Sequence, residues 1–374
     1  MSDRLMPAMI AVLLGGLLAI ALLVPYVAVS FRRRGQLGIG HVLLAVGALV
    51  YGLALVAYVL LPLPDVDADF CTRFARLVEP QLHPFQFVQD IRDQQHGSGL
   101  PELVANPALQ QVVLNVALFV PLGAFVRYLA GGSVLLTTAI GAAVSLLIEL
   151  TQLSGIWWIF PCPYRLFDVD DLTANTTGAL LGALAGPLLR LVPGQRVSGP
   201  PDAPRPVTTG RRLLGMVCDL LAVQLTGALL NGALDVVLLL IGIPSAGPGR
   251  PGWLGPVDGA LSWWVPGVLL LFVLPQFGGG ATVGQRAVLL RPVGLDECDP
   301  SRGRRLVRAL VGSGGFVVLA GLGGIAGLLA TLLVPVTVVA AWHTEGHRGL
   351  SGVAAGVGVV DARSRATAGI TAGP

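Results

Sequence analysis

Long apolar stretches, several of about 18 residues or more, dominate this 374-residue chain. A stretch of that length crosses about 30 Å of hydrocarbon as a helix. Lipid offers the backbone no hydrogen-bond partners, so a segment that crosses it must bond internally. Charged residues make up 12% of the chain, against roughly 25% in soluble domains, and the mean hydropathy is +0.76. We therefore expect an all-α, polytopic helical membrane protein with about eight transmembrane helices.

The first predicted module covers residues 1–192 and holds five spans. Its opening apolar run, from Pro7 to Ser30, is too long for a secretory signal, and no small-residue cleavage site follows it. Arginines 32–34 come directly after the run, which predicts a cytoplasmic cluster and an N-terminus outside the cell. The other spans are expected at about 41–61, 108–129, 133–153 and 171–191.

A Pro/Gly-rich stretch, residues 193–210, is typical of an interdomain linker. The second predicted module, residues 211–362, holds three or four spans and is followed by a flexible tail, residues 363–374. Its last apolar run, Ala309 to Trp342, is too long for one untilted helix. The sequence leaves open whether that run is one span or a re-entrant hairpin, and therefore on which side the tail lies.

Polar side chains inside lipid are costly unless they are paired, so their positions are informative. The topology drawn from arginines alone places polar residues of four separate segments in one outer layer. These residues form the predicted ligand-binding cluster: Asn115, Glu149, Gln152, Arg165, Asp168, Asp171 and Asn175. Gly178, Gly182 and Gly186 add a small-residue ridge that lets a neighbouring helix approach closely.

Structural roles remain open for the same residues. Asp168 and its neighbours precede a helix that starts outside, where carboxylates cap helix ends. Glu149 and Gln152 share a helix face and could bridge helices instead of contacting a ligand. Arg165 suits a phosphate head group or an ion pair with Asp168. Hard cations need about six oxygen ligands, and few are visible here, so we expect no metal and no cofactor. The sequence has no stripe of basic residues, so we do not expect it to bind nucleic acid.

Cysteine positions predict one covalent link. The topology places Cys71 and Cys162 outside, and Cys218 and Cys298 on the inner side. Because an oxidising exterior permits disulfides, we expect Cys71 to pair with Cys162, with free thiols as the alternative.

Three ordered motifs of the first module resemble the VanZ-like family. They are Asn115-Val-Ala-Leu-Phe-Val-Pro-Leu-Gly, Glu149-Leu-Thr-Gln and the segment from Arg165 to Gly178, and His83-Pro-Phe resembles an upstream element of the family. The resemblance covers about residues 40–192 and implies a link to low-level resistance to the glycopeptide teicoplanin. It suggests a Gram-positive cell-envelope protein whose outer site engages membrane lipids, a lipid-linked cell-wall precursor or the glycopeptide. All 24 basic residues are Arg, which favours a GC-rich genome such as that of an actinobacterium.

The second module resembles the RDD family over about residues 205–362. The resemblance rests on the Arg212…Asp219 spacing, on Thr282-Val-Gly-Gln-Arg286 and on His347-Arg-Gly-Leu, although the Asp expected in the closing motif is Gly352 here. Arg212, Asp219 and Arg286 are the candidate residues, and an intramembrane pair of Arg212 with Asp219 explains the first two. Two other functions therefore stay open: a small-solute or ion transporter using this module, and a membrane-embedded hydrolase or transferase acting on a lipid-linked substrate. Enzymatic activity, the ligand and the oligomeric state are left undecided.

Overall fold

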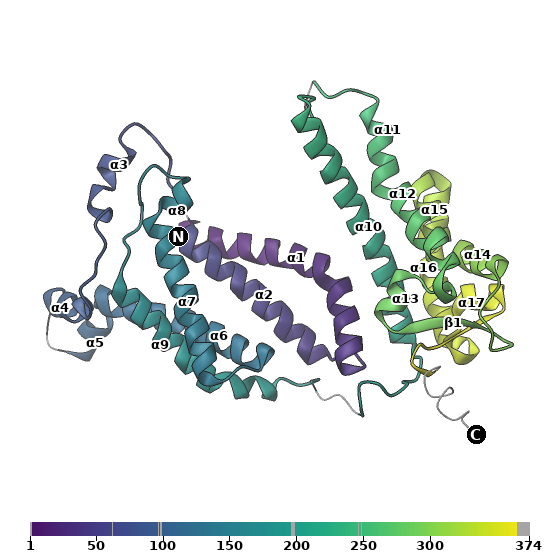
Figure 1. Cartoon of the computed structure of the whole chain (residues 1–374), viewed down its shortest axis with the longest axis horizontal. Coiled ribbons are helices and arrows are strands. Elements are labelled where there is room, and N and C mark those ends of the chain that lie inside the picture. The colour runs from purple at the N-terminus through teal and green to yellow at the C-terminus, as the bar shows by residue number, and fades with distance from the viewer. Residues whose placement is uncertain are drawn as a thin grey trace. The chain divides into compact units, whose positions relative to one another are not determined.

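The computed structural model describes residues 2–61, 63–95, 97, 99–195, 199–245, 247 and 249–364, with the side chains of residues 2–12 left aside (Figure 1). In this part of the chain, eight helices are long and apolar enough to cross a membrane, or nine if one bent helix pair counts as a span. The chain is therefore a multi-pass helical membrane protein. It divides into two compact units, Met1–Ala19 with Gly38–Arg196, and Ile20–Leu37 with Val197–Pro374.

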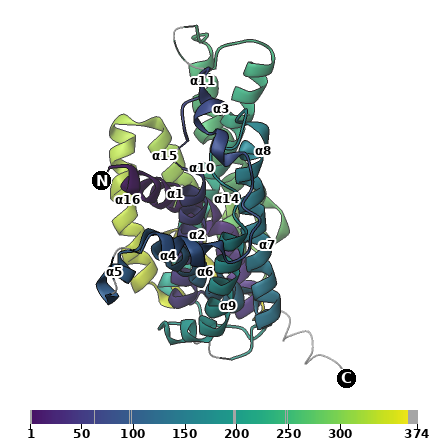
Figure 2. The ribbon, with the colours of Figure 1, turned by 90° about the vertical axis from the view of Figure 1, so that its left-hand side faces the viewer.

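The first unit contains four complete apolar helices and a long connection that carries short ones. Its elements are the first part of α1 (Ser2–Arg34), α2 (Ile39–Leu60), α3 (Phe70–Arg73), η1 (Ala75–Leu77), α4 (Gln86–Asp93), α5 (Leu100–Val104), α6 (Pro107–Ala130), α7 (Val134–Leu153), α8 (Gly155–Trp158), α9 (Val169–Ala185) and η2 (Gly186–Leu191). Helices α6, α7 and α9 lie side by side in both views and form the centre of this unit (Figures 1 and 2).

Helices α6 and α9 pack with their backbones nearly in contact. A Cβ atom added at Gly178 would lie 2.2 Å from the Val116 carbonyl oxygen, and one at Gly182 would lie 2.0 Å from that of Val120. On the opposite helix, a Cβ at Gly123 would lie 2.1 Å from the Ala179 carbonyl oxygen. The glycine ridge predicted from the sequence is therefore the contact surface of α9, as expected for small residues at membrane helix interfaces.

Side-chain caps position the helices of this unit. The Asn106 oxygen accepts hydrogen bonds from the Ala108 and Leu109 amides at 3.0 and 3.2 Å, so α6 begins directly after it. The Asn106 amide also donates to the Ile91 carbonyl at 2.8 Å, which holds α4 against the start of α6. Ser133 caps α7 by accepting from the Leu136 amide at 3.1 Å.

The second unit combines apolar helices with one short antiparallel ladder. Its elements are α10 (Thr209–Leu240), α11 (Leu254–Gly259), η3 (Ala260–Trp264), α12 (Val265–Gly267), η4 (Val268–Val273), η5 (Leu274–Gln276), η6 (Gly278–Gly280), α13 (Val283–Ala287), β1 (Leu290–Gly294), α14 (Arg302–Val311), α15 (Ser313–Leu322), α16 (Gly324–His343), η7 (Glu345–His347), α17 (Gly349–Ala355) and β2 (Val357–Asp361). Residues 254–276 form one continuous span with π-helical turns. The β1–β2 ladder, with Leu290 opposite Asp361, was not anticipated from the sequence.

The last apolar run is two helices rather than one span. Gly323 and Gly324 adopt positive φ angles of 64° and 52°, which end α15 and start α16, and the two helices pack against each other. At its other end α15 meets α14 at a 50° bend.

The end of α1 belongs to the second unit, although it lies within the residues 1–192 that the sequence predicts as one module. Val27 and Phe31 are buried with Cys218, Val288 and Val359 in one apolar cluster. The Arg211 guanidinium lies 5.3 Å from the centre of the Phe31 ring, close enough for a cation–π contact. Aromatic and aliphatic contacts, not distance along the chain, decide this assignment.

Candidate functional site

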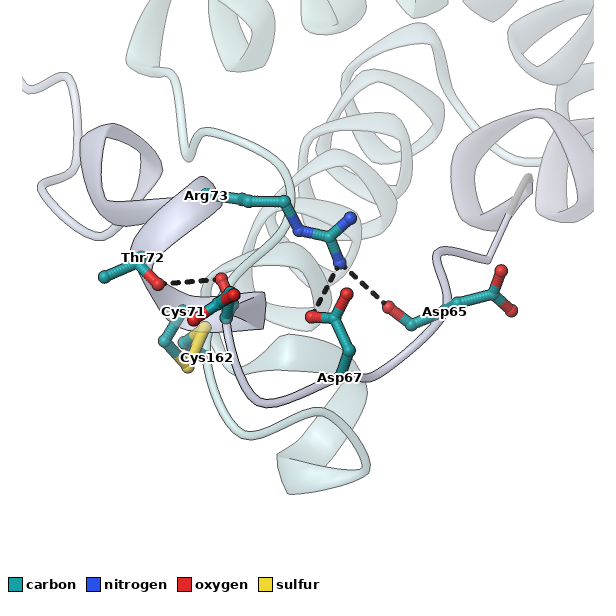
Figure 3. The surroundings of a disulfide bond; sticks show 7 residues. Asp65, Asp67, Cys71, Thr72, Arg73 and Cys162 are labelled. Carbon is teal, nitrogen blue, oxygen red and sulfur yellow. Dashed lines mark hydrogen bonds and ion pairs between the residues drawn. A yellow bond between two sulfur atoms is a disulfide. The ribbon is translucent and has the colours of Figure 1, made fainter.

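A disulfide ties the long connection after α2 to the connection between α7 and α9. Cys71 and Cys162 are bonded, with Cα atoms 5.8 Å apart, so the pairing expected from the sequence is present (Figure 3). Beside it, Arg73 reaches back to the Asp67 carboxylate at 3.0 Å and to the Asp65 carbonyl at 3.2 Å (Figure 3). Phe70, Phe160 and Tyr164 form a buried aromatic cluster against which Cys162 packs. The two connections therefore form one folded layer at this end of the helices.

Backbone pairing continues this layer to the start of α9. Gln81 pairs with Asp168 in an isolated parallel bridge, in which the Gln81 amide donates to Phe167 at 2.9 Å and accepts through its carbonyl from Val169 at 3.2 Å. The Asp170 carboxylate is buried and accepts from the Phe85 amide at 2.6 Å and the Phe87 amide at 3.0 Å. Phe85 itself has a positive φ of 67°, a conformation that non-glycine residues rarely adopt. Asp170 thus holds the Phe85 turn against α9.

Asp168 caps α9 and does not line the cavity described below. Its carboxylate accepts from the Asp170 amide at 2.8 Å, and its own amide donates to the buried Glu149 carboxylate at 3.0 Å. Burial raises the pKa of Asp168, with hydrogen bonds from the Asp170 and Asp171 amides acting in the opposite direction. The capping role left open by the sequence is therefore the one this residue has in the structure.

Asp171 faces α6 from the first turn of α9. Its carboxylate oxygen accepts hydrogen bonds from the side-chain amides of Asn115 and of Gln111, the latter at 3.4 Å. Gln111 was not predicted, although it stands four residues before Asn115 and therefore on the same helix face. The contact joins two helices through an ionisable group that keeps capacity for further hydrogen bonds.

Deeper in the bundle, Asn175 connects α9 to α7. Its amide nitrogen donates to the Ser145 hydroxyl at 2.9 Å, while its buried oxygen has no hydrogen-bond partner among the described residues. Buried polar atoms without a partner are uncommon and call for a specific explanation.

Nearer the end of the bundle, Arg165 donates to the Leu61 carbonyl at 2.9 Å, and Tyr164 donates to the Leu60 carbonyl at 3.0 Å. These bonds hold the end of α2 beside the site.

A cavity of about 370 Å³ opens between α2, α6, α7 and α9, and we call it the polar cavity. Six of the seven residues of the predicted cluster line it, all but Asp168: Asn115, Glu149, Gln152, Arg165, Asp171 and Asn175. Gln110 and Gln111 extend its polar wall, and Tyr58, Val59, Leu114, Leu118 and Ile148 supply an apolar one. Such a surface, apolar on one side with hydrogen-bonding groups on the other, is suited to an amphipathic ligand.

The chemistry of the polar cavity is that of hydrogen bonding with separated charges. It offers two carboxylates, one guanidinium and several amides. Within the described part of the chain, no group of three or more His, Cys, Asp or Glu could hold a metal ion. The groups that line the cavity can hold a ligand through hydrogen bonds.

The candidate residues of the second unit contact other groups than predicted. The Asp219 carboxylate accepts from the Thr282 hydroxyl at 2.8 Å and from the Gly284 amide at 2.7 Å. Arg212 donates to the His347 carbonyl at 2.7 Å, so the expected Arg212–Asp219 pair is not formed. Arg286 donates to the Ala281 carbonyl at 3.1 Å. Helix α13 approaches α10 so closely that a Cβ at Gly284 would lie 1.8 Å from the Gly215 carbonyl oxygen. This approach places Thr282 and Gly284, and not Arg212, within hydrogen-bond distance of Asp219.

Comparison with protein families gives a match that lies within the first unit. A family model described as VanZ/LLP1 matches residues 48–190, the region that holds the polar cavity and the layer above it. This part of the chain is therefore VanZ-like. No curated protein and no solved structure shows significant similarity to the chain.

Proposed function

We propose, starting from the VanZ-like character of residues 48–190, that this protein acts in the cell envelope. In this proposal the polar cavity binds a lipid-linked envelope component and thereby alters susceptibility to glycopeptide antibiotics such as teicoplanin. The observation that carries the proposal is the cavity itself, where six predicted polar residues face an apolar wall. An amphipathic ligand satisfies both walls at once.

Individual groups indicate how such a ligand would be held. The Asn175 oxygen lacks a partner and would accept a hydrogen bond from a ligand hydroxyl or amide. Arg165 donates one hydrogen bond to the Leu61 carbonyl and has further N–H donors for a phosphate or carboxylate. Tyr58 and Leu114 are 56% and 65% exposed at the apolar wall, where an acyl chain would lie.

Orientation in the membrane is part of the proposal. The disulfide and the polar cavity share one end of the helices, and an oxidising exterior suits a disulfide. Arginines 32–34 end α1, in keeping with a cytoplasmic position for that helix end. We therefore propose that the cavity faces outward and that the N-terminus is outside.

The test is teicoplanin susceptibility of a sensitive Gram-positive host that expresses wild-type protein or Asp171→Asn. The substitution keeps an oxygen for Asn115 and Gln111 but removes one of the two carboxylates of the cavity. Asp93→Asn is the matched control, because Asp93 is exposed on α4 and does not line the cavity. We expect wild type and the control to raise resistance, and Asp171→Asn to lose the effect at equal membrane abundance.

Two outcomes would count against the proposal. If the host that expresses wild-type protein at good levels is no more resistant than the host without it, the glycopeptide link is wrong. Equal resistance with Asp171→Asn removes the polar cavity from the mechanism.

A second candidate, transport by an RDD-like second unit, has one supporting observation. Asp219 contacts Thr282 and Gly284, so two segments that resemble separate motifs of that family meet in the structure. This function predicts a solute or ion flux that disappears with Asp219→Asn and persists with Asp171→Asn, measured in vesicles that contain the purified chain.

A further inference from the structure

The second unit encloses a small cavity into which three arginines from two helices converge. It measures about 40 Å³, and we call it the arginine cavity. Arg212 and Asp219 of α10 and Arg305 and Arg308 of α14 contribute its charged groups. Gly312, Ser313 and Gly314, at the start of α15, also line it, together with groups of other elements such as α13 and η5.

The single carboxylate does not neutralise these arginines. Asp219 is engaged by the Thr282 hydroxyl and the Gly284 amide, and none of the ion pairs between described residues involves it. Arg212 is 3% exposed and donates to a backbone carbonyl. Arg305 likewise donates to the Pro300 and Gln276 carbonyls, at 2.7 and 2.8 Å. The cations are therefore held by neutral acceptors.

Arg308 is the residue with the clearest unmet requirement. It is 9% exposed and donates to the Gln285 side-chain oxygen at 3.2 Å, yet its buried Nε has no hydrogen-bond partner among the described residues. Asp219 attracts Arg308 without forming an ion pair with it, so three arginines face one carboxylate in this cavity. Excess buried positive charge is unfavourable, and a buried N–H without an acceptor adds to that cost. A negatively charged acceptor would satisfy both.

The backbone adds to the same preference. Gly312 is the N-cap of α15, a 10-residue helix, and no side chain caps that end. The first N–H groups of an α-helix lack intrahelical acceptors, and the helix dipole favours negative charge there. Side chains and helix end therefore select the same sign of ligand.

We propose that the arginine cavity binds a small inorganic anion, of the size of a halide or nitrate. About 10–15 Å³ is needed to hold one water molecule, so this volume admits a few water-sized groups and not a lipid head group or nucleotide. The Arg308 Nε–H donates to the anion, and Arg212 and Arg305 supply charge from the other sides.

The test is thermal unfolding of the full-length protein, purified in detergent, at constant ionic strength. Sodium gluconate, whose anion is too large for the cavity, is replaced stepwise by sodium chloride or sodium nitrate, and a choline chloride series separates anion from cation effects. A ligand that binds only the folded state stabilises it by RT ln(1 + [L]/Kd), so the unfolding temperature rises with the anion concentration and its dependence on concentration gives Kd. We expect such a rise for chloride and nitrate in wild type.

Arg308→Gln should raise the Kd for the anion about tenfold or more, as expected for loss of one hydrogen bond to a charged group. Arg304→Gln is the matched control, because Arg304 lies exposed on the same helix and does not line the cavity. If Arg308→Gln does not fold, Arg305→Gln replaces it, and broadening of the chloride-35 resonance by wild type, reversed by nitrate, reports binding directly. No anion-specific rise in wild type, or an unchanged rise in Arg308→Gln, would show that the cavity holds water only.

Discussion

The tight packing of α6 against α9 makes a prediction that can be worked through from the geometry. Gly182 lies where a Cβ would be 2.0 Å from the Val120 carbonyl oxygen, while ordinary van der Waals contact begins at 3.4 Å. Gly182→Ala therefore requires the two backbones to separate locally by about 1.4 Å, because the contact atom is main chain and cannot rotate away. Overpacking of this kind costs about 1–3 kcal/mol of the free energy of unfolding.

Gly52 in α2 provides the opposite case. A Cβ added there meets nothing within 4 Å. Gly52→Ala should therefore stabilise the protein by about 0.5–1 kcal/mol, since alanine loses less conformational entropy in a helix. The same chemical change is expected to have opposite signs at two glycines, with the two variants separated by about 1.5–4 kcal/mol.

Reversible unfolding of the purified variants in mixed detergent micelles measures this difference. The same separation of α6 from α9 would lengthen the Asn115–Asp171 contact, so Gly182→Ala should also weaken ligand binding in the polar cavity. Gly182→Ala being as stable as Gly52→Ala, or more so, would refute the reasoning and show that these helices are not in close contact.

Two further predictions concern the disulfide and the second unit. Cys71→Ser opens a crosslink with a sequence separation of 91. In the chain-entropy picture this should destabilise the layer above the polar cavity by at most about 4.6 kcal/mol, which faster proteolysis between residues 61 and 106 would reveal. The control Cys298→Ser changes an exposed free thiol and should leave the cleavage rate unchanged. Asp361 is buried; burial alone would raise its pKa, but hydrogen bonds from Arg363, Arg211 and the Arg205 amide hold that pKa well below its usual range. The Asp361 carboxylate therefore stabilises the fold above the unfolded pKa of about 3.9, and this stabilisation is lost as the pH falls toward the folded pKa. The unfolding temperature of the wild type should drop below about pH 4, and that of Asp361→Asn should drop less. Equal acid sensitivity of the two proteins in thermal scans would show that Asp361 does not stabilise the fold in this way.

The sequence allowed the fold class to be predicted because the thickness of the bilayer sets the length of every span. The cluster of six polar residues was predictable for a related reason. Once the spans are assigned, helical spacing and the depth of each residue place Asn115, Glu149 and Asp171 at the same end of the bundle. Gln111 could have been added by the same spacing.

Other features depended on tertiary contacts that the sequence does not display. The sequence does not distinguish a carboxylate that caps a helix from one that faces a cavity. In the structure Asp168 caps α9 and Asp171 faces the polar cavity. The partner of Asp219 lies 63 residues away, at Thr282. The break of the last apolar run at Gly323 could not be located, because glycines occur throughout membrane helices and most do not end them.

The crosslink between the two connections has a consequence for the assembly of the chain. Cys71 precedes α6, and Cys162 follows α7, so two candidate spans lie between the bonded sulfurs. Two thiols can meet on one face of a bilayer only if the intervening chain has crossed it an even number of times. The bond therefore cannot form while only one of the two helices is inserted. Its presence in a newly made molecule therefore excludes the half-inserted state, in which one of the two helices has crossed and the other has not.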